Sequence, residues 1–366
     1  MRRSISLFFL LAPLAFGQSA RSVTTPYHAP ASVNFYIATG GSDSNPCTSA
    51  SKCLTLAHAL LLVPQTLDNN YTINVADGTY AEPINPSGFI GTGMYAGGRN
   101  TQLQILGNTT TPANVVFSGT VACTAEDTRD SFLSGACISG SANVKLNGLT
   151  ITNGQRNGIA CYNGNLELAK TVVTMTGGSG AASVGFDGLT CHALITDNVT
   201  VSGFDTTTSP TGGLGFYVGR LSQISFLAGT LTVTGPGTGS SMSADGTIGI
   251  VVENEANFVV AALGTIATIS GVQSGINLAA NSSFSQFAGG MTMNISNGST
   301  TPTSSIGVQV NNGSTFDWLS GTISIDHYSV CLQATVNSEA ASSATTANFT
   351  NCTAHVTATG GQIVGF

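Results

Sequence analysis

From about residue 130 onward, apolar and polar positions alternate in short runs that end at Gly, Asn or Ser. A period of two is typical of β-strands with one buried face. One sequence repeat recurs. A small residue begins an alternating strand, which is followed by a turn and a second alternating strand. The openings lie at Gly135, Gly158, Gly188, Gly215, Gly249, Gly275 and Gly307. Repeats of roughly 20–35 residues without a helical stretch predict a solenoid, whose coils bury their inner faces by stacking.

The second strand of each repeat is equally regular. These strands begin at Leu149, Val173, Val199, Leu231, Ala267, Met293 and Ile323. A leucine-rich repeat would carry a Leu-x-x-Leu-x-Leu signature, which is missing, and propeller blades need longer and more regular units. The pattern therefore predicts an all-β, single-stranded parallel β-helix solenoid.

Three N-terminal motifs add a family resemblance. They are Tyr36-Ile-Ala-Thr-Gly-Gly-Ser-Asp43, then Leu54-Thr-Leu-Ala-His-Ala59, then a strand from Ile73 that ends in Gly78-Thr-Tyr80. This segment resembles the N-terminal part of pectin-lyase-like β-helix proteins. The resemblance implies a right-handed β-helix with an N-terminal capping helix, here over 53–63. It implies a cap over 34–84 and coils over 85–366, which together form one domain.

The chain begins like an exported protein. Arg2 and Arg3 precede a mostly apolar run that ends in small residues, which predicts a signal peptide over 1–17 and a linker over 18–33. The apolar run is too short to span a membrane. The formal net charge is −7 and no Lys or Arg follows Arg220, so nucleic acid is not an expected partner.

In an exported chain, eight cysteines are expected to form disulfides rather than a metal site. Cys47 and Cys53 suit a local bridge, Cys123 and Cys137 flank a charged loop, and Cys331 and Cys352 lie near the C-terminus. The remaining two are Cys161 and Cys191. We favour a bridge between them over two stacked buried thiols, because the repeat places both at the same inward position.

The strand register predicts which side chains are buried. If the opening residue is position zero, positions one and three point inward and positions two and four outward. The predicted inward pairs are Ile159/Cys161, Leu189/Cys191, Phe216/Val218, Ile250/Val252, Ile276/Leu278 and Val308/Val310.

The outward positions gather the few charged and aromatic residues of the coils. Tyr162, His192, Arg220 and Glu253 are predicted to form one exposed column over four coils, although ordinary solvated strand positions would give the same pattern. In an enzyme, Arg220, His192 and Glu253 would be the catalytic candidates. The substrate-binding candidates are Tyr162, Tyr217, Asn277 and Arg156, because tyrosine rings stack on sugars and Arg or Asn side chains bind hydroxyls and carboxylates.

Two classes of enzyme with this fold would each require particular residues near that column. A polysaccharide lyase needs a base, and often calcium, to handle a uronate carboxylate, but no calcium-binding aspartate cluster is evident. A glycoside hydrolase similar to polygalacturonases would carry Asn-x-Asp, Asp-Asp and Arg-x-Lys motifs, and none of them occurs. No cofactor is expected, apart from calcium in the case of a lyase.

These observations favour a secreted, periplasmic or cell-surface protein that binds an extracellular or surface carbohydrate, in an adhesin-like or structural role. The alternative is a lyase or hydrolase that acts on an acidic polysaccharide, and whether the protein is an enzyme stays open. The expected partner is a polysaccharide or cell-surface glycan. A homotrimer is a further alternative that the fold suggests, although no trimer-forming segment is visible.

Overall fold

The computed structural model describes residues 32–91, 102–124, 131–152, 156–176, 183–204, 213–236, 246–261, 263–287, 290–297, 304–343 and 346–366. The chain divides into two units, Met1–Pro30 and Ala31–Phe366. The expected signal peptide (1–17) and most of the expected linker (18–33) therefore lie outside the described residues. Ser32 and Val33 begin the first strand.

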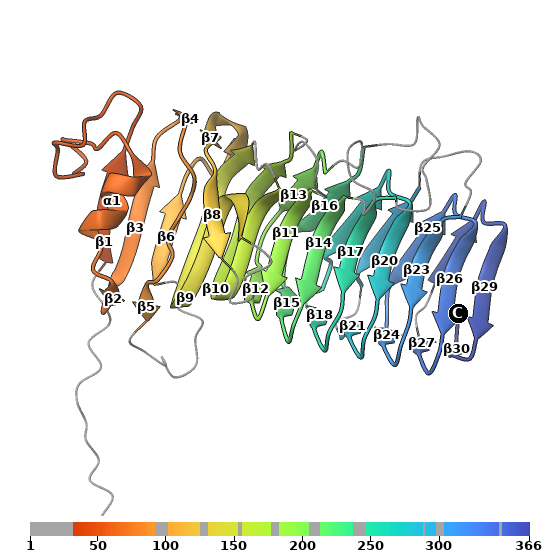
Figure 1. Ribbon diagram of the computed structural model, residues 1–366. Coiled ribbons are helices and arrows are strands. Elements are labelled where there is room, and N and C mark those ends of the chain that lie inside the picture. Colours follow the sequence, from red (N-terminus) through yellow and green to blue (C-terminus); the bar gives the residue numbers. More distant parts are fainter. Residues whose placement is uncertain are drawn as a thin grey trace, which may run out of the picture. The chain divides into compact units, whose positions relative to one another are not determined.

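The second unit is a parallel β-helix whose coils have three sides (Figure 1), which confirms the predicted fold class. Two long strands, β9 (Ser131–Thr152) and β10 (Asn157–Thr174), each run along all three sides of one coil. Every strand pair in the described chain is parallel except the pair formed by β8 (Val121–Thr124) and the start of β9.

We name the three sides faces A, B and C. Beside β9 and β10, face A contains β11 (Val184–Leu189), β14 (Leu214–Gly219), β17 (Ile248–Val252), β20 (Ser274–Leu278), β23 (Ile306–Val310), β26 (Val330–Thr335) and β29 (Ala354–Thr359). Face B contains β1 (Ser32–Ile37), β3 (Asn70–Val75), β6 (Leu103–Leu106), β12 (His192–Ile195), β15 (Gln223–Phe226), β18 (Asn257–Val260), β21 (Ser283–Gln286), β24 (Thr315–Trp318), β27 (Glu339–Ser342) and β30 (Gln362–Val364).

Face C contains β4 (Gly78–Tyr80), β7 (Val115–Phe117), β13 (Val199–Ser202), β16 (Thr230–Thr234), β19 (Ile266–Ser270), β22 (Thr292–Ser296), β25 (Thr322–Asp326) and β28 (Thr346–Thr350). These strands include the predicted closing strands of the repeats. Outside the three faces, β2 (Thr66–Leu67) pairs with β5 (Ile90–Gly91), and a single turn of 3-10 helix covers Pro112–Asn114.

Stacked identical side chains fill the interior. Phe258, Phe284 and Phe316 form one stack along face B, with ring centroids 5.1 and 5.3 Å apart. Phe186 and Phe216 stack in the same way from face A, at 5.3 Å. These spacings match the distance between neighbouring strands in a sheet, so each of these coils adds one ring to its stack.

The N-terminal end of the solenoid is covered by α1, a helix that spans Leu56–Leu62 and is shorter than the predicted 53–63. Leu56 and Ala59 are its buried residues. The helix begins late because Thr55 is its N-cap and accepts a hydrogen bond from the His58 amide at 3.1 Å. The Glu82 carboxylate accepts bonds from the next free amides, those of Leu56 (2.7 Å) and Ala57 (3.0 Å).

All six predicted inward pairs are buried, but in one of them Leu189 is buried in a separate outer cluster and does not point into the core. The coil that we opened at Gly188 opens at Gly185, because Phe186 pairs with Ile159 and Phe216 in the observed register. Leu189 therefore lies on the outer surface of face A, paired with Tyr162. A Cβ built on Gly185 would lie 2.7 Å from the Gly215 carbonyl oxygen, so the close approach of successive coils requires glycine at this corner.

Four disulfides join Cys47–Cys53, Cys123–Cys137, Cys161–Cys191 and Cys331–Cys352. The favoured Cys161–Cys191 bridge is confirmed, with a Cα–Cα distance of 5.7 Å. Its geometry differs from the predicted one, because the strand partner of Cys161 is Gly188 and not Cys191. Gly188 carries no side chain, and Cys191 turns inward from the following bend to reach Cys161.

Candidate functional site

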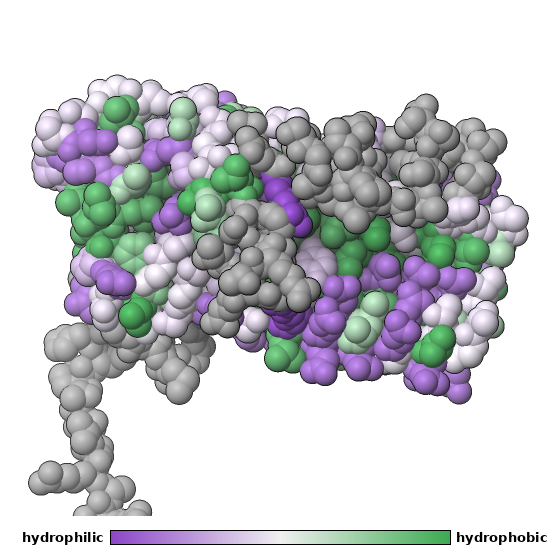
Figure 2. Space-filling model, in the orientation of Figure 1, coloured by the Kyte–Doolittle hydropathy of each residue, from purple (hydrophilic) through white to green (hydrophobic). Residues whose placement is uncertain are grey.

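The outer surface of face A separates into an apolar and a polar band. The first outward position of each strand is mostly apolar, as at Leu214, Ile248, Ile306 and Val330. The next two outward positions carry the polar and aromatic residues. Figure 2 shows the same division, with hydrophobic colour beside a hydrophilic region that runs along the C-terminal coils. The candidate site lies where the polar band meets β8.

Tyr162 is not the exposed residue that the sequence predicted. It is 2% exposed and packs in an outer cluster with Cys123, Cys137, Ala160 and Leu189. The antiparallel strand β8 folds back over this part of face A, and the Cys123–Cys137 disulfide holds it there. The ring of Tyr162 is therefore a packing element that supports the site, and its face is not available to stack on a sugar.

Beneath this cluster, three side chains form a buried hydrogen-bond network. The Tyr162 hydroxyl donates to Asp187 Oδ2 at 2.6 Å, and Asn157 Nδ2 donates to the same oxygen at 2.9 Å. Asn157 is fully buried and Asp187 is 7% exposed. A carboxylate this deeply buried is stabilised by such charge-assisted bonds. Asp187 is not evident as a site residue in the sequence, because a coil opening at Gly188 would put it in a turn.

The next outward position along this column is Tyr217, the strand partner of Asp187. Its hydroxyl donates a hydrogen bond to Glu253 Oε1, which lies one coil further along. The ring lies over Gly219, where an added Cβ would lie 2.9 Å from both Cε1 and the hydroxyl oxygen of Tyr217. Gly219 thus leaves the space that lets Tyr217 cross to Glu253, and both predicted residues belong to one arrangement.

Electrostatics keep the Tyr217 hydroxyl protonated. Burial raises the pKa of Tyr217 well above its ordinary value, and the hydrogen bond and charge of Glu253 raise it further. The charge of Asp187 acts in the same direction and the charge of Arg220 opposes it. At neutral pH this hydroxyl is therefore a hydrogen-bond donor and not a base.

Arg220 begins the turn that leads from face A to face B. Arg220 and Leu221 both have positive φ, 51° and 61°. In the later coils, the second of these positions is occupied by Glu255, Asn281, Gly313 and Asn337, and three of these four are residue types that tolerate this conformation better. The turn holds the exposed Arg220 close enough to Tyr217 for its charge to act on the hydroxyl. Its pair of positive φ angles recurs at this corner in the following coils, so it belongs to the solenoid and not to this site alone.

A ladder of amides continues the column toward the C-terminus. Tyr217, Val251 and Asn277 are successive partners, followed by Gln309 and Gln333. Gln309 Nε2 donates to Gln333 Oε1 at 3.2 Å, and Asn311 Nδ2 donates to Asn277 Oδ1 at 3.4 Å. Asn277 therefore lies on the same face as Tyr217, two strands away, or about 10 Å at the usual strand spacing.

Of the two remaining predicted residues, Arg156 lies near the site and His192 lies on another face. Arg156 immediately precedes Asn157 and donates its backbone amide to the Leu133 carbonyl at 3.3 Å, which puts it at the start of the strand that carries the buried network. His192 does not belong to the column, because it pairs with Asn165 and Gln223 on face B. The shift in coil opening accounts for this error, since Leu189 and not His192 occupies the fourth position.

The donor set of the site does not provide a calcium cage. Among the described residues, the group of three His, Cys, Asp or Glu side chains close enough to share a metal is Cys47, Cys53 and His58. Two of its members are joined in a disulfide. Asp187 and Glu253 belong to no such group in this part of the chain, so we derive no step through calcium. Within the same residues, no helix is long and apolar enough to cross a bilayer.

Comparisons with known proteins do not assign a family. No protein-family model matches the chain, and no curated protein matches it. Among solved structures, a rhamnogalacturonan lyase is similar, with 16% sequence identity and a TM-score of 0.43. That similarity covers 84% of this chain and 75% of the other. At this level of identity the comparison says nothing about the activity of the protein described here, which rests on its own residues.

Proposed function

We propose that face A binds an extended extracellular glycan, with Tyr217, Arg220 and Glu253 at the centre of the binding surface. The observation that carries this proposal is the Tyr217–Glu253 hydrogen bond beside Arg220. The whole chain has only 10 Lys and Arg residues and 17 Asp and Glu residues. A tyrosine, an acid and a base gathered on adjacent coils of such a chain are a concentrated set of groups for binding hydroxyls and carboxylates.

The shape of the surface supports a linear ligand. Parallel strands present the polar side chains at a regular interval of about 4.8 Å. The amide ladder of Asn277, Gln309 and Gln333 extends the central groups along the solenoid. Amides both donate and accept hydrogen bonds, so they can pair with a sugar hydroxyl that donates or with one that accepts. The ligand class is therefore a polysaccharide that runs along the coil axis, found outside the cell, where disulfides persist.

Binding without cleavage is favoured over lyase activity. Proton abstraction next to a uronate carboxylate needs a group that is unprotonated near neutral pH. Tyr217 is held protonated by burial and by the Glu253 carboxylate. The Asp187 carboxylate is buried and occupied by Tyr162 and Asn157. The Glu253 carboxylate already accepts the Tyr217 hydroxyl, so these groups suit recognition of a carbohydrate better than removal of its protons.

The discriminating experiment incubates the purified protein with a panel of acidic and neutral polysaccharides, with and without calcium. Binding is followed by affinity electrophoresis, and unsaturated product by ultraviolet absorbance. The proposal expects retardation by at least one polysaccharide with no rise in absorbance. An absorbance rise that requires the protein would instead establish the lyase alternative. If no polysaccharide retards the protein, the proposal fails.

A further inference from the structure

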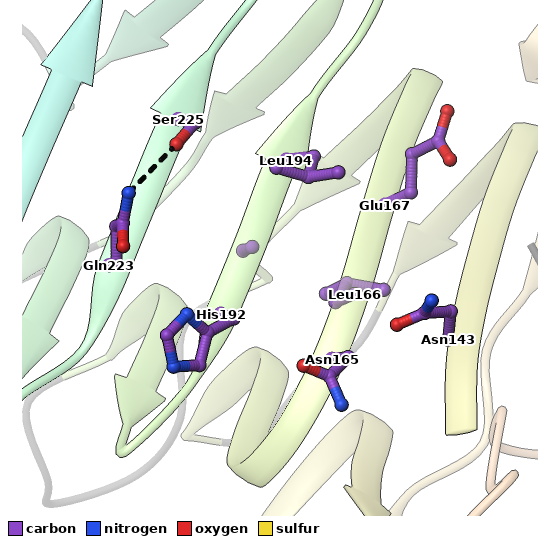
Figure 3. A pocket seen from close by; sticks show the side chains of 9 residues that line it. Asn143, Asn165, Leu166, Glu167, His192, Leu194, Gln223 and Ser225 are labelled. Atoms are coloured by element: carbon purple, nitrogen blue, oxygen red, sulfur yellow. Dashed lines mark hydrogen bonds between the residues drawn. The ribbon is translucent and has the colours of Figure 1, made fainter. Parts of the chain in front are cut away.

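Face B carries a second candidate site, in a pocket formed by four successive strands. Its outer row consists of Asn143, Asn165, His192 and Gln223, which are consecutive strand partners from β9 to β15. Figure 3 shows these side chains along one edge of the pocket, with Glu167, Leu194 and Ser225 in the adjacent row. Its volume is about 220 Å³, which is smaller than the roughly 300–1,000 Å³ of sites for drug-sized ligands.

The polar groups of this pocket carry little uncompensated charge. The Glu167 carboxylate accepts a hydrogen bond from Lys145 Nζ at 2.7 Å and another from Thr196 Oγ1 at 2.7 Å. The half-buried Lys145–Glu167 pair is therefore neutral as a unit. A strongly charged ligand would find no opposite charge here to offset the loss of its hydration.

The remaining lining matches a ring that carries several hydroxyls. Carboxamides offer both donors and acceptors, and a neutral imidazole offers one of each. A sugar hydroxyl has the same dual character. Leu194 lies between the polar groups and is half-buried, so it presents an apolar surface to the C–H face of a ring. His192 is exposed and lies at the rim of the pocket, next to Asn165.

We infer that this pocket binds one neutral sugar unit of a glycan, as a second site separate from face A. Asn165, His192 and Gln223 bind its hydroxyls, and Leu194 packs against its ring. The inference does not depend on the glycan proposed for face A, because Tyr217, Glu253 and the amide ladder lie on a different side of the coils. Because Arg220 and Gln223 lie close in sequence at the corner between the two faces, the two sites would be neighbours.

The test uses saturation-transfer NMR and titration of the full chain with uncharged glycans: galactan, arabinan, mannan, xylan and cello-oligosaccharides. His192→Ala and Gln223→Ala are expected to weaken binding of the preferred neutral glycan by tenfold or more. Asn257→Ala is the matched control, because Asn257 is the next residue of the same row and lies outside the pocket lining. Thermal melts of all variants confirm that they fold.

The inference is overturned if no neutral glycan binds, or if the His192 and Gln223 variants bind as tightly as the Asn257 control. Arg220→Ala separates the two proposals. If neutral-glycan binding survives in Arg220→Ala but is lost in His192→Ala, the pocket is an independent site. If Arg220→Ala abolishes it as completely as His192→Ala does, the inference of a separate site is wrong.

Discussion

The Tyr217 hydroxyl donates a hydrogen bond to the Glu253 carboxylate across two adjacent coils. The two residues lie far apart in sequence, and they meet because β14 and β17 are in register. Gly219 makes room for the tyrosine ring, and Arg220 follows it directly. The proposed binding surface is thus built from one strand end and its neighbour.

Removing the Tyr217 hydroxyl should change how stability depends on pH. Because the pKa of Tyr217 is raised in the folded protein, its contribution is present below the unfolded tyrosine pKa of about 10 and is lost as the pH rises above it. Tyr217→Phe is expected to make the free energy of unfolding fall less steeply above pH 10. Urea denaturation between pH 8 and 11 measures this, and equal slopes for wild type and variant would contradict the assignment.

Gly219→Ala should displace the Tyr217 ring. The added methyl group would lie 2.9 Å from the ring and hydroxyl atoms, so one of them must move. We expect a loss of about 1–3 kcal/mol, as for other overpacked sites, and loss of the bond to Glu253. Gly219→Ala in a Tyr217→Ala background is the control. If the substitution costs as much there as in the wild type, the tyrosine ring is not what fills this space.

Leu221→Asn should stabilise the protein. Leu221 is 62% exposed and has a φ of 61°, a conformation that asparagine tolerates better than leucine. The expected gain is about 0.5–1 kcal/mol, measured as a shift in the denaturation midpoint without a change in slope. Leu263→Asn is the control for removing an exposed leucine, since Leu263 is 79% exposed and is not among the residues with positive φ. An equal gain in both variants would point to solubility and not to the turn.

Replacing both Cys161 and Cys191 by serine should destabilise the coils under the site. The bridge closes a loop with a sequence separation of 30 residues, for which loop-closure estimates give about 3–4 kcal/mol. Both side chains are fully buried, so two hydroxyls add a further cost. Denaturation of the double variant against a Cys161→Ala/Cys191→Ala pair separates the two effects. A double alanine variant as stable as wild type would show that the bridge contributes nothing.

Much of the solenoid could be predicted from the sequence, because stacking coils convert a period of two directly into inward and outward positions. The error arose where two patterns look alike, since Gly188-Leu-Thr-Cys has the same apolar and cysteine spacing as Gly158-Ile-Ala-Cys. The better signal was Gly185 followed by Phe186, which matches Gly215 followed by Phe216. The burial of Tyr162 could not be predicted, because the strand that covers it approaches antiparallel from a separate segment.

The candidate site was predicted in part. Arg220 and Glu253 were predicted as members of an outward-facing column, and the register of β14 and β17 brings them to Tyr217. Asp187 was missed, and His192 was placed on the wrong face. Both follow from the same three-residue shift in one coil, since in a β-helix such an error moves a side chain to another side of the solenoid.

The most direct test of the proposed function is the dissociation constant of the polysaccharide that wild-type protein retains, measured by calorimetry with Arg220→Ala. A charge-assisted hydrogen bond is worth about 1.5–3 kcal/mol, so the account predicts binding that is roughly ten- to a hundredfold weaker. Lys170→Ala is the matched control, because Lys170 also has a positive φ and pairs at 3.8 Å with Asp197, away from face A. Unchanged affinity in Arg220→Ala, or an equal loss in the Lys170 control, would contradict a glycan site on face A.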